Sequence, residues 1–141
     1  MKRVIILLAL FVLLLGVAAV GVIVWRDNRF DSGVMALKED NGAMALQRLL
    51  PLAQLGDAEA QETVGWIYAI GAGGVRKDDN AAIYWFRKTG RFGRARMGND
   101  AAARMSQVAA AYANGSDGAP LSKTESRKWL KLAASEDSAP Q

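Results

Sequence analysis

Residues 51–88 read PLAQLGDAEAQETVGWIYAIGAGGVRKDDNAAIYWFRK, and this stretch decides the fold. Asp57 can cap a helix that continues to Ile70, because apolar residues recur there at steps of three and four. The glycine-rich segment 71–74 ends this helix, and Asp78 can cap a second one. The stretch therefore predicts two helices joined by a short loop.

The same pattern recurs along the chain, which indicates an internal repeat. Residues 66–71 (WIYAIG) lie 44 residues before residues 110–115 (AAYANG), and no gap is needed to align the sequence around them. A partial copy comes first, because residues 41–56 match residues 78–93 at an offset of 37. A single helix pair cannot bury its own apolar face, whereas stacked pairs can, so units of this kind occur in series.

These repeats predict an all-α fold, a short α-solenoid of about two and a half antiparallel helix pairs. We place the repeat domain at residues 33–135 and expect a disordered tail at 136–141. Residues at apolar or equivalent repeat positions should form the core between the helices. They are Val64, Ile67, Tyr68, Ala82, Trp85, Val108, Tyr112 and Trp129.

The N-terminal segment has the composition of a membrane-spanning helix. Residues 4–25 contain no charged or strongly polar residue, and as a helix they would span about 33 Å. That length suffices for a hydrocarbon core of about 30 Å, and Trp25 at its end is typical of an aromatic belt. We therefore expect a basic tail at 1–3, a transmembrane signal-anchor helix in the lipid bilayer at 4–25, and a juxtamembrane linker at 26–32.

Two questions about this segment concern its processing and its orientation. Lys2 and Arg3 also fit the positive region of a cleaved signal peptide, with 17–19 as a cleavage site. Cleavage there would leave an apolar mature N-terminus, which favours the uncleaved anchor. Basic residues are nearly balanced on the two sides, but a positive tail followed by an apolar run favours export of the domain. We expect a single-pass protein of the inner (cytoplasmic) membrane with a periplasmic C-terminal domain.

The composition excludes several classes of function. The 141 residues include no Cys and no His, which excludes a disulfide framework, a thiol nucleophile, a Ser-His-Asp triad and an ordinary Cys/His zinc site. The net charge of +4 includes Lys2 and Arg3 in the tail. The rest lacks the concentrated basic face of a nucleic-acid-binding domain. We therefore expect no enzyme activity, no cofactor, no metal and no nucleic-acid partner.

Two features are candidates for contact with a partner. The first is the basic run at residues 87–96, which contains no acidic residue. It is either a solvated turn or a contact for an acidic protein surface or anionic lipid headgroups. Trp66 is equivalent to Ala110 in the next repeat, so the repeat does not require its ring. The expected partner-binding residues are Arg87, Lys88, Arg91, Phe92, Arg94, Arg96 and Trp66.

The stretch at 51–88 resembles the Sel-one-like repeat family, an α-solenoid family related to tetratricopeptide repeats. The family combines a Pro-Leu-Ala…Gly-Asp-Ala entry with a later Tyr-x-x-Gly motif and an aromatic pair on the second helix, and residues 105–134 match more weakly through YANG and RKWLKLAA. The resemblance implies a protein–protein interaction module, a scaffold or adaptor at the bacterial cell envelope, with an unidentified protein partner. The alternative is an immunity or inhibitor protein that blocks a secreted toxin or enzyme.

Overall fold

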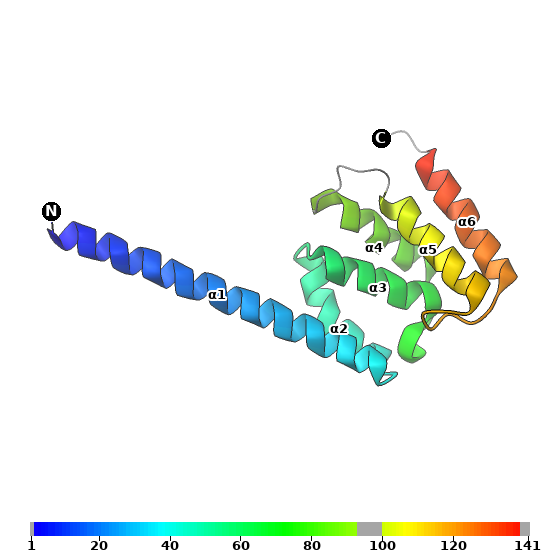
Figure 1. Ribbon diagram of the computed structural model, residues 1–141, viewed down its shortest axis with the longest axis horizontal. Helices are drawn as coiled ribbons and strands as arrows, with labels where there is room; N and C mark the ends of the chain where they lie inside the picture. Colours follow the sequence, from blue (N-terminus) through cyan, green and yellow to red (C-terminus); the bar gives the residue numbers. More distant parts are fainter. Residues whose placement is uncertain (1, 93–99, 139–141) are drawn as a thin grey trace.

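The computed structural model describes residues 2–92 and 100–138, with side chains at 6–89 and 101–138 (Figure 1). The α-helices are α1 (Lys2–Lys38), α2 (Gly42–Gln54), α3 (Ala58–Ile70), α4 (Asp79–Phe92), α5 (Asp100–Asn114) and α6 (Lys123–Asp137). A short 3₁₀ turn, η1 (Ala72–Gly74), follows α3. No strand occurs within the described ranges, which confirms the all-α class.

The helices form three antiparallel pairs, in which the last part of α1 packs with α2, α3 with α4, and α5 with α6 (Figure 1). In each pair, the residue before the second helix donates its backbone N–H to a carbonyl oxygen near the end of the first helix. These bonds join Asn41 to Ala36 at 2.8 Å, Asp78 to Tyr68 at 2.9 Å and Ser122 to Tyr112 at 2.8 Å. Equivalent bonds at equivalent positions establish the repeat register in all three pairs.

Residues 26–32, expected as a linker, are helical and belong to α1. The helix continues to Lys38 and supplies the first helix of the first pair. Contacts between α1 and the rest of the domain begin at Arg26, which pairs with Asp57, rather than at Gly33. The segment is helical because it continues α1 and packs on α2. The structure therefore has three helix pairs where the sequence predicted about two and a half.

α1 and α3 each approach their partner helix closely at a glycine. An added Cβ would lie 2.6 Å from Cγ of Leu49 at Gly33, and 2.7 Å from Cε1 of Phe86 at Gly65. Both distances are shorter than a normal contact, so a larger residue would displace the packed side chain. The two glycines occupy equivalent positions in the first and second pairs, which extends the repeat into α1.

The core consists of two clusters, one between the first and second pairs and one between the second and third. In the latter, the rings of Phe86 and Trp129 meet edge to face with centroids 6.4 Å apart. Of the residues expected in the core, Tyr68 is half-buried. The others are buried, namely Val64, Ile67, Ala82, Trp85, Val108, Tyr112 and Trp129. Burial between neighbouring pairs is what a stacked solenoid requires.

Ion pairs tie the third helix pair to the second. Lys128 on α6 binds Asp79 on α4 at 2.6 Å and Glu125 at 2.7 Å, and Glu125 also pairs with Lys77. Burial raises the pKa of Glu125, but hydrogen bonds from Lys128 and Lys77 outweigh this effect and lower the pKa below its usual value. The network therefore stays ionised at neutral pH and links the N-terminal ends of α4 and α6.

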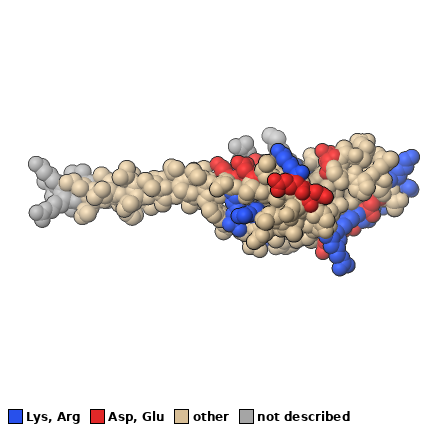
Figure 2. Space-filling view, turned by 90° about the horizontal axis from the view of Figure 1, so that it is seen from below, with Lys and Arg blue, Asp and Glu red and all other residues tan. Residues whose placement is uncertain are grey.

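The first part of α1 projects from the domain as an arm without charged residues in the part that Figure 2 colours. Side chains from Ile6 to Trp25 are exposed, and most of them are large and apolar. The helix is long and apolar enough to cross a membrane, a property that it shares with signal sequences near an N-terminus.

Replacing Trp129 by alanine should strongly destabilise the domain, because its side chain is fully buried against Phe86. We expect the free energy of unfolding to fall by about 3–5 kcal/mol. The next residue, Leu130, is 52% exposed and serves as the matched control. Leu130→Ala should cost less than about 1 kcal/mol. Equal losses for the two variants in denaturant unfolding would contradict the packing of α6.

Candidate functional site

Two hollows lie on the side of the domain that is formed by the first helix of each pair. One, of about 370 Å³, is lined by Phe30, Glu59, Glu62, Thr63 and Trp66. The other, of about 520 Å³, is lined by Glu62, Trp66, Gln107, Ala110, Ala111, Asn114, Ser116 and Asp117. Because they share Glu62 and Trp66, the hollows form one groove across α1, α3 and α5, which we call the Trp66 groove.

Trp66 stands between the two hollows and is half-buried. One side of its ring packs against the core between the second and third pairs. Its indole N–H donates to the carbonyl oxygen of Asp117, 3.4 Å away in the loop before α6. The equivalent residue on α5 is Ala110, which lines the same groove and leaves space beside the ring. Trp66 therefore offers an open aromatic face between two first helices.

Two of the carboxylates that line the groove, Glu59 and Glu62, are paired with arginines. Glu62 of α3 binds Arg104 of α5 at 2.8 Å, which ties two walls of the groove together. Arg26 of α1 binds Asp57 at 2.6 Å and also pairs with Glu59. Burial raises the pKa of Asp57, but the hydrogen bond from Arg26 outweighs it and lowers the pKa below its usual value. The side of the groove near α1 and the contact between α3 and α5 thus each carry ion pairs beside the Trp66 ring.

This arrangement suits noncovalent binding of another molecule in the groove. Among the side chains that the structure describes, no group of three or more His, Cys, Asp or Glu residues lies close enough together to hold a metal ion. An aromatic ring with one open face, flanked by compensated charges, suits an apolar side chain of another protein. Aromatic residues of this kind carry much of the energy of protein–protein interfaces.

The structure describes only the beginning of the basic run. Arg87 binds both carboxylate oxygens of Glu136 on α6, at 2.8 and 2.7 Å, so its guanidinium links two helices. Lys88 lies over the rings of Tyr84 and Trp85, 4.9 and 5.3 Å from their centroids. The expected contact residues whose side chains lie outside the described residues are Arg91, Phe92, Arg94 and Arg96.

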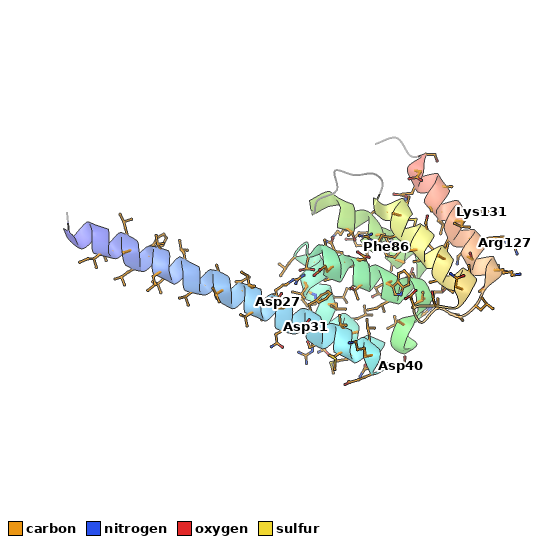
Figure 3. All side chains as sticks on the ribbon, in the orientation of Figure 1. Asp27, Asp31, Asp40, Phe86, Arg127 and Lys131 are labelled. Carbon is orange, nitrogen blue, oxygen red and sulfur yellow. The ribbon has the colours of Figure 1, made fainter. Side chains whose placement is uncertain are left out.

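Three cations form a stripe along α6 that sequence reasoning missed. Lys123, Arg127 and Lys131 are exposed, and Figure 3 shows Arg127 and Lys131 on the outer side of α6. In the second pair, the residue equivalent to Arg127 is Ile83, which packs against the third pair. A further pair stacked on this side of α6 would have to bury this cation, which is costly without a counter-charge. The signal for the stripe is the four-residue spacing of three cations on one predicted helix.

The residues with which Trp66 forms its groove were also missed. Glu59, Glu62 and Thr63 precede Trp66 at helical spacing on one predicted helix, which was the available signal. Phe30 and Arg104 come from helices far away in the sequence, and packing alone brings them to the groove.

Comparison with known protein families identifies the Sel1 repeat at residues 58–91 and 99–138, which correspond to the second and third helix pairs. No curated protein and no solved structure gives a significant match. The matched residues make up more than half of the chain and confirm the resemblance seen in the sequence. Sel1 repeats are protein–protein interaction modules. The chain therefore belongs to the Sel1 repeat family.

Proposed function

We propose that this protein is a membrane-anchored interaction module whose Trp66 groove receives a segment of a partner protein. The observation that carries the proposal is the half-buried Trp66 ring, which lines both hollows between the first helices. An aromatic anchor in a groove can supply a large part of the binding energy of a protein–protein contact. Protein binding is the general property of Sel1 repeats, and the groove provides a place for it.

The apolar part of α1 supports anchoring in a membrane. Its exposed apolar side chains are unfavourable in water and favourable in hydrocarbon. Trp25 at its end is 44% exposed, and the guanidinium of Arg29 lies 5.6 Å from the centroid of its ring. Aromatic and basic residues in this place are typical of a membrane–water interface. We propose that the helix is a single span of the inner membrane and that the repeat domain lies in the periplasm. The protein would then act as a scaffold or adaptor at the bacterial cell envelope.

The basic run supports a second contact, with an acidic surface of the partner. It continues beyond Lys88 with Arg91, Arg94 and Arg96 and contains no acidic residue. Exposed cations chiefly steer association and set its salt dependence. In this proposal the run speeds the encounter, and the Trp66 groove holds the bound segment.

Replacing Trp66 by alanine should weaken partner binding without unfolding the domain. We expect the affinity to fall at least about 30-fold, which corresponds to about 2 kcal/mol for an interface hot spot. Leu130, which is 52% exposed on α6 and outside both the groove and the basic run, is the control. Quantitative mass spectrometry of proteins co-purified from solubilised membranes identifies the partner, and titration measures its affinity. Binding that Trp66→Ala retains and Leu130→Ala loses would move the contact surface to α6.

The full chain should remain in the membrane pellet after a high-salt wash and should keep its full mass. Salt screens surface charges, whereas a spanning helix is held by apolar transfer, which salt does not weaken. A mature N-terminus at Val20 would contradict the anchor. A reporter fused after Gln141 should be active in the periplasm, and activity confined to the cytoplasm would reverse the orientation.

A further inference from the structure

We infer that the turn between α2 and α3 lies in the interface of the bilayer that α1 spans, with Leu55 in contact with lipid. The inference rests on the membrane anchoring proposed above and adds a surface of the repeat domain to it. The side chain of Leu55 is 76% exposed, although leucine is among the most apolar residues of the chain. Because the turn lies beside the membrane-spanning segment, the partner that we infer for Leu55 is lipid.

Because α1 is continuous, it fixes the position of this turn relative to the end of the apolar segment. Trp25 ends the apolar run, and Arg26 follows it in the same helix, about 1.5 Å further along the axis. The Nε of Arg26 lies 2.6 Å from Oδ2 of Asp57, the residue that caps α3. This ion pair holds the α2–α3 turn beside the end of the apolar run, at the depth where an aromatic belt residue lies.

The antiparallel order of the helices separates two sets of loops. α2 runs back from residues 39–41 toward Trp25, and each later helix reverses direction, so the α2–α3 turn lies at the end of the domain nearest the arm (Figure 1). The loops within pairs lie at the opposite end, and the last of them contains Leu121. Leu55 and Leu121 are similarly exposed, 76% and 70%, but lie at opposite ends of the domain.

The chemistry of the turn suits the interface of a bilayer. Leu55 lies between an uncharged glutamine and a glycine, and it belongs to neither core cluster. The carboxylates that follow it, Asp57 and Glu59, are both paired with Arg26. The apolar side chain gains free energy by leaving water, and the charges beside it are already compensated. The contact therefore requires no anionic lipid.

The absence of cysteine from the chain allows single labels to test this contact. A nitroxide is attached to Leu55→Cys, to Leu121→Cys as the matched control, and to Val12→Cys within the span, each in the full chain in phosphatidylcholine vesicles. Power saturation then compares collisions with oxygen, which concentrates in lipid, and with a nickel chelate, which stays in water. The oxygen-to-nickel ratio should be several-fold higher for the Leu55 label than for the Leu121 label, and highest for the Val12 label.

Failure of the inference and failure of the anchor give different results. A high ratio for the Val12 label with equal, water-like ratios for the Leu55 and Leu121 labels would keep the anchor and overturn the lipid contact. A water-like ratio for the Val12 label would overturn the anchor and the inference with it. Both leucines are exposed, so the labelled variants should keep the circular dichroism and the unfolding transition of the unlabelled chain.

Discussion

The stability of the repeat domain depends on burial of the apolar side of α2, and α1 buries it. Ala45, Leu49 and Leu52 are buried, and Gly33 lets Leu49 approach the α1 backbone. One helix therefore presents two apolar surfaces, one around its whole first part and one along a single side of its last part. Because α1 has no break between them, the orientation of the domain follows from the helix, which a flexible linker would not allow.

The three helix pairs use the same backbone contacts with different side chains. Asn41, Asp78 and Ser122 each cap a second helix and also donate a backbone N–H to the end of the first helix. The first pair lies before the residues matched by the Sel1 repeat, yet it shares these bonds. At the other end, Arg127 stands at the position that is equivalent to Ile83, which packs on the core between the second and third pairs. The three described pairs thus run from a long apolar helix, α1, to an exposed row of cations on α6.

Helices α3 to α6 could be predicted because their signals are local. Asp57 and Asp78 precede helices and accept hydrogen bonds from their first turns. Gly71 and Gly115, at equivalent positions with φ of 73° and 65°, end the first helices of their pairs. These features, with the repeat offset, place Trp129 in the core before any coordinates are known.

The first helix of the first pair and most of the Trp66 groove could not be predicted in this way. Between Arg26 and Lys38, Phe30, Gly33, Ala36 and Leu37 face the core, but this short apolar stripe begins among polar and charged residues at 26–32, which suggest a linker. The sequence does indicate Trp66 itself, because the equivalent residue of the next repeat is Ala110. Arg104 reaches the groove only through the packing of α5 on α3, which no local pattern specifies.

If α1 is one rigid element from the bilayer into the domain, the amides of residues 26–38 must be protected from solvent exchange. Hydrogen exchange of the full chain in phospholipid nanodiscs measures this protection by mass spectrometry of peptides from that segment. A continuous helix packed on α2 predicts exchange as slow as that of α3, whose amides lie between two helix pairs. Exchange as fast as that of an unstructured peptide would show a linker between the arm and the domain and would contradict the continuous helix.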